Sequence, residues 1–223
     1  MTRNVRTYDH FCVIARALED VGDRWTLLVI RDLLSGAKRF TDLMDRLVSI
    51  TPKTLTQRLR ELEDTGIVAA ERTPGRREVW YRLTSAGEDL RPVIDALGWW
   101  GLQHAWRWPQ EDEPMHAEHL LRAVAQAIDV AASAHVTELW HFRIDGADYV
   151  IEGDGKHWSH RAGTPQFAAD VTITARTDAL KRLIFGESDL DVEIEGASAK
   201  VQRFRKLITT LATVVSAQET SSR

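Results

Sequence analysis

The stretch from Thr51 to Val68, TPKTLTQRLRELEDTGIV, constrains the fold most because it specifies one short helix with both ends marked. Thr51 suits the N-cap, Pro52 suits the first helical position, and Gly66 suits the position that follows a helix. Leucines recur at the i, i+4, i+7 spacing of a single buried stripe, at Leu55, Leu59 and Leu62. The sequence therefore predicts an amphipathic helix with one buried face.

The opposite face of this helix is polar and basic. At about 100° per residue it carries Lys53, Gln57 and Arg60, with Thr54 and Thr56 on its flanks. Such side chains hydrogen-bond to base edges or phosphates, and the N-terminal turn adds the positive end of the helix dipole. The pattern indicates a helix that reads the DNA major groove, although an ordinary amphipathic surface helix fits this stretch alone equally well.

The residues before the helix favour the DNA-binding interpretation. Residues 11–34 predict two amphipathic helical segments, and residues 40–47 predict a short third helix before a turn at 48–50. Two short helices joined by a tight turn, the second with a polar outer face, form a helix-turn-helix pattern. The first segment has an apolar stripe formed by Phe11, Ile14, Ala15, Leu18 and Val21.

The residues after the helix predict a basic hairpin. Strands are expected over 67–73 and 78–84, with a turn at Pro74–Arg77 between them. A hairpin directly after a helix-turn-helix is a wing, and adjacent arginines at its tip are placed to reach a phosphate or the minor groove. The residues expected at DNA are Arg39, Lys53, Thr54, Thr56, Gln57, Arg60, Arg76 and Arg77.

The distribution of charge agrees with this assignment, although the net charge of −4 is unusual for a DNA-binding chain. Residues 1–110 hold 17 Lys and Arg against 15 Asp and Glu, whereas residues 111–223 hold 12 against 18. Positive charge is concentrated in residues 38–82, which hold 10 basic and 7 acidic residues. The asymmetry indicates a DNA-binding first half and an acidic second half.

A tryptophan-rich helix is expected over residues 85–106. It and the residues just after it hold more aromatic surface than one small domain buries, which indicates a homodimer contact. The alternative is that these rings pack beneath the C-terminal domain. The tryptophans are Trp99, Trp100, Trp106 and Trp108.

Residues 8–108 resemble the winged-helix transcriptional regulators of the HxlR type, which are relatives of the MarR group. The resemblance is carried by Cys12, thirteen positions before Trp25 in GDRWTLLVIRDLLSGAKRF, and then by LTQRLRELEDTGIV and YRLTSAGEDL. It implies a DNA-binding homodimer of bacteria or archaea. It also implies that the helix residues Lys53, Thr54, Gln57 and Arg60 enter the major groove, and that Arg76 and Arg77 lie on the wing.

The cysteine carries a second implication of the resemblance, because some relatives sense oxidants or electrophiles through it. Family members often have proline after this cysteine, where this chain has Val13. We expect Cys12 to lie in an apolar helix with no neighbouring base to lower its pKa, and therefore to be an inert packed thiol. Redox sensing by Cys12 is the alternative.

A domain boundary is expected at PQEDEP, residues 109–114, where two prolines bracket three acids. The expected organisation is a winged-helix domain over residues 1–108, a linker over 109–115 and a second domain over 116–223. The second domain shows short alternating runs between helices expected over 116–134, 177–185 and 197–215. This order predicts an α+β domain with an antiparallel sheet covered on one face.

The second domain resembles the sterol-carrier-protein-2-like domains through ADVTITARTDALKRLIFGE and EIEGASAKVQRFRKLITTL. The resemblance implies an apolar tunnel between sheet and helices that holds a hydrophobic ligand. A packed core without a ligand is the alternative. The residues expected to line the tunnel are Trp140, Phe142, Trp158, Phe167, Leu183, Phe204 and Leu207.

Other chemistry is not expected. His116 with His119, and His157 with His160, are spaced to share a metal, but no cysteine or carboxylate spacing completes a zinc signature. The single cysteine excludes a disulfide within the chain. There is no phosphate loop, dinucleotide fingerprint or G-x-S-x-G nucleophile motif, so we expect neither an enzyme nor a cofactor. No apolar run approaches the ~20 residues of a membrane span, and a cytoplasmic location without membrane contact is expected.

Together these features predict a dimeric, DNA-binding transcriptional regulator, expected to be a repressor, on a pseudo-palindromic double-stranded operator. Its C-terminal domain is expected to bind a small hydrophobic effector. Two alternatives remain open from the sequence. One is a lipid-binding or interaction module, and the other is a constitutive repressor whose C-terminal domain is purely structural.

Overall fold

The computed structural model divides the chain into two compact units, residues 1–94 and 95–223. The division lies within helix α6 (Arg91–His104) and is therefore N-terminal to the expected linker at 109–115, which stays a prediction. No helix in the part of the chain that the structure describes is both long and apolar enough to cross a membrane. The described residues are 7–72, 75, 78–105, 107, 109–110, 113–130, 136–187 and 191–221.

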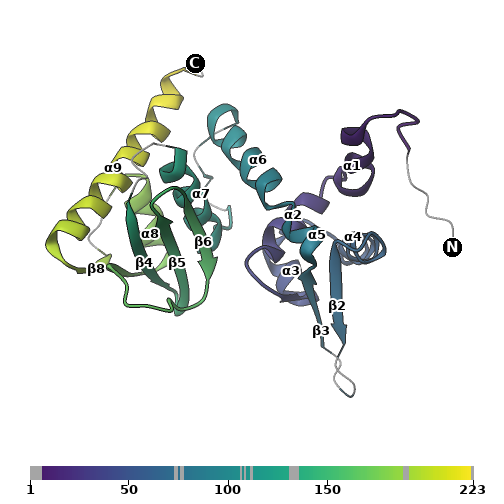
Figure 1. The fold of residues 1–223 in the computed structure, drawn as a ribbon, viewed down its shortest axis with the longest axis horizontal. Helices are drawn as coiled ribbons and strands as arrows, with labels where there is room; N and C mark the ends of the chain where they lie inside the picture. Colours follow the sequence, from purple (N-terminus) through teal and green to yellow (C-terminus); the bar gives the residue numbers. More distant parts are fainter. Residues whose placement is uncertain are drawn as a thin grey trace. The chain divides into compact units, whose positions relative to one another are not determined.

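The first unit combines helices with a small antiparallel sheet of order β1-β3-β2 (Figure 1). The expected helix-turn-helix and the two wing strands are confirmed. Strand β1 was not expected, because two residues are too few to show an alternating pattern. The elements before α6 are α1 (Val13–Val21), α2 (Thr26–Leu33), β1 (Lys38–Arg39), α3 (Phe40–Arg46), α4 (Pro52–Asp64), β2 (Val68–Arg72), β3 (Val79–Leu83) and α5 (Ser85–Glu88).

Helix α4 has the ends that its sequence specifies. Thr51 Oγ1 accepts a hydrogen bond from the Thr54 backbone N–H at 3.1 Å, and Pro52 is the first helical residue. Gly66 follows the helix with φ of +72°, a conformation that disfavours residues with a Cβ atom. The leucine stripe is at most 1% exposed and packs in one core with α2 and α3, so the predicted buried face is confirmed.

Two expectations for the first unit were wrong in detail. The helix expected over 85–106 is interrupted after Glu88 and starts again at Arg91, where Pro92 suits a first turn because its missing N–H would have no partner there. Cys12 does not lie inside a helix, because its backbone is extended and it is the N-cap residue of α1.

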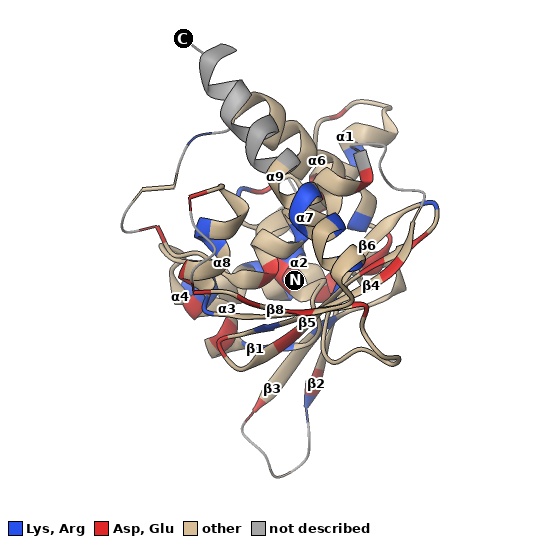
Figure 2. Cartoon of the chain, turned by 90° about the vertical axis from the view of Figure 1, so that its left-hand side faces the viewer, with Lys and Arg blue, Asp and Glu red and all other residues tan. Residues whose placement is uncertain are grey.

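The second unit is an α+β arrangement in which α7, α8 and α9 lie on one side of a five-stranded sheet (Figure 2). The strand order is β6-β5-β4-β7-β8. The α+β expectation is confirmed. The elements after α6 are α7 (Ala117–Val130), β4 (Thr137–Ile144), β5 (Ala147–Asp154), β6 (Trp158–Ala162), β7 (Val171–Ala175), α8 (Thr177–Ile184), β8 (Glu193–Gly196) and α9 (Ser198–Ser221).

The expected antiparallel sheet is instead mixed, because β4 and β7 pair in parallel from Trp140↔Val171 to Ile144↔Ala175. Strands β4, β5 and β6 form a meander that grows to one side of β4. After β6 the chain must cross the sheet to reach the free edge of β4. This crossover connection lets β7 run parallel to β4. Alternation within single strands does not show such a crossing, so the sequence could not predict it.

Candidate functional site

The outer face of α4 presents the side chains that the sequence placed there. Lys53, Gln57 and Arg60 are exposed, on the side of the helix opposite the buried leucines. Within the described part of the chain, Lys53 and Arg60 form no ion pair. These two cations are therefore available for phosphate groups, which bind Lys and Arg through charge-assisted hydrogen bonds.

The two threonines on the flanks of this face form hydrogen bonds within the start of α4. Thr54 Oγ1 lies 2.8 Å from Thr51 Oγ1, and Thr56 Oγ1 donates to the Pro52 carbonyl at 2.7 Å. Both side chains are only half-buried, but their hydroxyl groups stabilise the first turn of α4. Their expected role at DNA stays a prediction.

Gln57 takes part in a side-chain network along the helix. Its Nε2 donates to Glu61 Oε1 at 2.6 Å, and Arg58 Nη1 lies 2.7 Å from Glu61 Oε2. Arg58 Nη1 also lies 3.2 Å from Asp23 Oδ2 in the segment before α2. The network joins the recognition face of α4 to the rest of the first unit.

Arg39 differs from the other residues expected at DNA because carboxylates of the protein surround its guanidinium group. Its Nε and Nη2 donate to the two carboxylate oxygens of Asp42 at 3.2 and 3.0 Å, and its Nη1 lies 3.5 Å from Glu78 Oε1. The hydrogen bond from Arg39 holds the pKa of the Asp42 carboxyl below its usual value. Arg39 also stacks 5.5 Å from the centre of the Trp80 ring, so it links the start of α3 to the wing.

The wing strands are held by ion pairs on their exposed sides. Arg72 of β2 lies 3.2 Å from Glu63 of α4, and Arg82 of β3 pairs with Glu71 across the two strands. Arg76 and Arg77 lie outside the described residues, between β2 and β3 in the sequence. Their expected contact with DNA stays a prediction.

Helix α1 and the residue Phe11 before it expose apolar side chains of the expected stripe. Phe11 is 88% exposed and Ile14 and Leu18 are also exposed, whereas Val21 is buried. Of the expected stripe only Val21 is buried in the core of the first unit, and Phe11 lies before the helix. Cys12, at the start of α1, is free and partly exposed.

The tryptophans of the α6 region have different environments. Trp100 is 56% exposed, whereas Trp99 packs against the core of the second unit. Trp106 and Trp108 lie outside the described residues. Packing in the second unit therefore accounts for Trp99, and the homodimer contact stays a prediction.

Six of the seven residues expected at the C-terminal tunnel lie together in one buried core. Phe167 is not among them, because it is 76% exposed in the connection between β6 and β7. The ring centres of Trp140 and Trp158 are 4.6 Å apart, and those of Trp140 and Phe204 are 5.0 Å apart. We call the six residues the aromatic cluster, and they are Trp140, Phe142, Trp158, Leu183, Phe204 and Leu207.

The two tryptophans of the aromatic cluster differ at their indole N–H groups. Trp140 Nε1 donates to Glu138 Oε2 at 3.1 Å, and the other oxygen of Glu138 lies 2.7 Å from Arg203 Nη1 and 3.3 Å from Lys200 Nζ. Trp158 Nε1 is buried and has no hydrogen-bond partner among the described residues. Glu138 was not predicted from the sequence, although it lies two residues before Trp140 and shares its face of β4.

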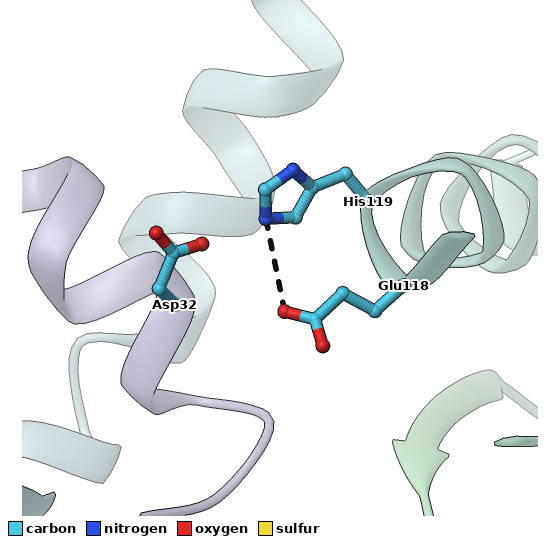
Figure 3. A group of neighbouring side chains, drawn as sticks. All are labelled: Asp32, Glu118 and His119. Atoms are coloured by element: carbon cyan, nitrogen blue, oxygen red, sulfur yellow. Dashed lines mark ion pairs between the residues drawn. The ribbon is translucent and has the colours of Figure 1, made fainter. Parts of the chain in front are cut away.

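The histidine pairs have different partners. The rings of His116 and His119 are 5.3 Å apart, and His119 Nε2 lies 3.7 Å from Glu118 Oε1 (Figure 3). His157 Nδ1 lies 3.4 Å from Asp129 Oδ1, at a side chain that is mostly exposed. One histidine of each pair thus lies beside a protein carboxylate. The expectation that neither pair binds a metal stays a prediction.

Comparisons with known proteins concern less than half of the chain. Residues 20–108 match the family described as HxlR-like helix-turn-helix. An uncharacterized HTH-type transcriptional regulator of Methanothermobacter thermautotrophicus is 36% identical over 96 residues, which span 42% of this chain and 72% of that protein. One from Mycobacterium tuberculosis is 41% identical over 109 residues, which span 48% of this chain and 66% of that protein. Among solved structures, the redox regulator HypR in its oxidized form is 32% identical, with a TM-score of 0.41 over 44% of this chain and 100% of that chain.

Proposed function

Because the chain belongs to the HxlR-like helix-turn-helix family, we propose that it is a DNA-binding transcriptional regulator. The observation that carries the proposal is the outer face of α4, where Lys53, Gln57 and Arg60 are exposed opposite the buried leucine stripe. We propose that the protein is a regulator and not an enzyme. The family match ends at residue 108, so the role of the second unit rests on separate support.

In this proposal α4 enters the major groove of double-stranded DNA. Lys53 and Arg60 contact phosphates, which fix the position of the helix, while Gln57 contacts a base edge, which gives specificity. Arg76 and Arg77 contact the backbone or minor groove beside the helix, as their place between the wing strands suggests. Arg39 links α3 to the wing, since Asp42 and Glu78 surround its guanidinium group.

The protein acts as a homodimer in this proposal. The exposed side chains include Phe11 just before α1, Ile14 and Leu18 of α1, and Trp100 of α6. A second copy would cover these large apolar side chains. A C2 dimer would place its two recognition helices in successive major grooves about 34 Å apart, which requires a pseudo-palindromic operator. Sedimentation of the full chain as a monomer at micromolar concentration would contradict this part.

The second unit is proposed to be a sterol-carrier-protein-2-like domain that binds a small, mainly apolar effector and relieves repression. The support for this assignment is the buried Trp158 N–H, for which a polar atom of the effector would be the acceptor. Effector binding changes operator affinity only if the effector prefers one dimer conformation. A coupling of ~1–3 kcal/mol would change that affinity about 5- to 150-fold.

Selection of duplexes from a random DNA library tests the DNA-binding function. We expect enrichment of a pseudo-palindrome and an affinity that falls steeply as salt rises. Arg76→Ala with Arg77→Ala should flatten the slope of log K against log salt by about one unit for each lost phosphate contact. No enriched sequence, together with binding that is insensitive to salt, would refute the proposal and favour an interaction module.

The effector is tested separately by native mass spectrometry and by titration with dodecanoic acid as an apolar probe with a polar end. A retained or bound ligand that lowers affinity for the selected duplex supports the sensing role. A chain that carries no ligand, does not bind the probe and binds DNA unchanged in its presence would instead be a constitutive repressor.

A further inference from the structure

The carboxamide of Gln57 is held by side chains that do not contact DNA in the proposed complex. Its nitrogen donates to Glu61 Oε1 at 2.6 Å, one helical turn further along α4. The other oxygen of Glu61 lies 2.7 Å from Arg58 Nη1, which also lies 3.2 Å from Asp23 Oδ2. Arg58 is only 19% exposed at its side chain, so Glu61 is tied to a largely buried cation and not to a free surface charge.

This arrangement fixes which way the amide of Gln57 faces. An ionised carboxylate accepts hydrogen bonds and donates none, so the amide nitrogen must be the atom that faces Glu61. One N–H of the amide is thereby occupied. The carbonyl oxygen and the second N–H are left for other partners, and we call them the free edge; Gln57 itself is exposed.

The free edge has the chemistry of an adenine reader. In the major groove adenine offers an acceptor at N7 and a donor at N6, and a glutamine amide satisfies both with one N–H and its oxygen. Guanine offers two acceptors there, at N7 and O6. An amide whose second N–H is already bound to Glu61 has only one donor left, so it cannot satisfy both acceptors of guanine.

We propose that Glu61 is a positioning residue that makes Gln57 specific for adenine, with Arg58 and Asp23 holding Glu61 in place. The inference rests on the proposed DNA-binding function of α4. Glu61 contacts no DNA in this account and acts only through Gln57. Because the amide is ordered before binding, less conformational entropy is lost when the base contact forms.

The test uses the full chain and the duplexes that the wild-type protein selects. The base pair read by Gln57 is the one whose preference disappears in Gln57→Ala. At that pair, the ratio of Kd values for G·C and A·T duplexes is measured for the wild type, Glu61→Ala and Glu61→Gln. Glu63→Ala is the matched control, because Glu63 lies on the same helix, is similarly exposed at 25% against 29%, and pairs with Arg72.

We expect Glu61→Ala to lower the ratio about tenfold, since a good bidentate contact discriminates by about this amount. Glu61→Gln should keep most of the preference, because its amide oxygen still accepts from Gln57 although the negative charge is gone. Glu63→Ala should leave the ratio unchanged, which separates positioning from the loss of an acidic group. Equal thermal midpoints of the variants show that folding is intact.

The outcomes separate the inference from the function on which it rests. If Glu61→Ala keeps the wild-type ratio, the inference is overturned while DNA binding stands. The same holds if Gln57→Ala changes no base preference in the selected site. Loss of the preference in Glu61→Gln as well overturns it in favour of a charge effect. If the wild-type protein selects no sequence, the proposed function fails and the inference fails with it.

Discussion

The indole N–H groups of Trp140 and Trp158 provide a matched pair of substitutions in the second unit. Replacing either residue with phenylalanine removes the same atoms from a side chain that is at most 5% exposed. The losses of packing are therefore similar at the two sites. What differs is the hydrogen bond, because Trp140 donates to Glu138 and Trp158 has no partner among the described residues.

The expected magnitudes follow from this difference. Trp140→Phe removes a hydrogen bond to a buried carboxylate, which is worth about 1.5–3 kcal/mol. Trp158→Phe removes a buried donor without an acceptor and relieves a desolvation penalty of about 1–3 kcal/mol. The two effects have opposite signs, so the free energy of unfolding of Trp140→Phe should be lower than that of Trp158→Phe by about 2.5–6 kcal/mol.

Urea unfolding followed by far-ultraviolet circular dichroism measures this difference without depending on tryptophan emission. The comparison is made in the absence of added ligand, at one pH and one protein concentration. If Trp158→Phe destabilised the unit as much as Trp140→Phe, the Trp158 N–H would have a partner in the folded protein. The Trp158 N–H would then give no support for an effector site.

Three further predictions concern single positions. Thr51→Ala should lower the free energy of unfolding by about 1 kcal/mol in thermal or urea unfolding, because it removes the N-cap of α4, and no change would contradict that cap. Arg39 lowers the pKa of Asp42 in the folded state, so ionised Asp42 stabilises the fold above the unfolded pKa of about 4. This stabilisation is lost as the pH falls below that value. Asp42→Asn should therefore lose less stability than the wild type between pH 7 and pH 3 in thermal unfolding. Phe204→Ala should cost about 3–5 kcal/mol of unfolding free energy, whereas Phe167→Ala should change it by less than about 0.5 kcal/mol, and equal effects would show that Phe167 is not an exposed side chain.

Helix α4 could be predicted from the sequence because its signals are local. The cap at Thr51, the proline after it, the leucine spacing and the glycine at its end all lie within one stretch of chain. Strand β1 could not be predicted, since its two residues become a strand only by pairing with β3. The same holds for Arg39, whose pairing with Glu78 depends on a contact across the sheet.

Periodicity specified which residues share a face but not what that face contacts. The stripe expected at residues 11–21 starts before α1, since Phe11 precedes the helix, and Phe11 and Ile14 are exposed in this chain. In the second unit, alternation placed Trp140 and Phe142 in the core, but it gave no sign that β7 would pair in parallel with β4. Phe167 was assigned by its apolar character alone, outside any alternating run, and it is exposed.

The most direct test of the central claim, that the outer face of α4 binds the DNA backbone, is the salt dependence of binding to the selected duplex. Lys53→Ala with Arg60→Ala removes two exposed cations from that face, and each phosphate contact contributes about 0.9 to the slope of log K against log salt. We predict a slope that is shallower by about two units, whereas Arg143→Ala with Lys156→Ala, which removes two exposed cations from the second unit, should leave it unchanged. An unchanged slope in the α4 variant would contradict the account.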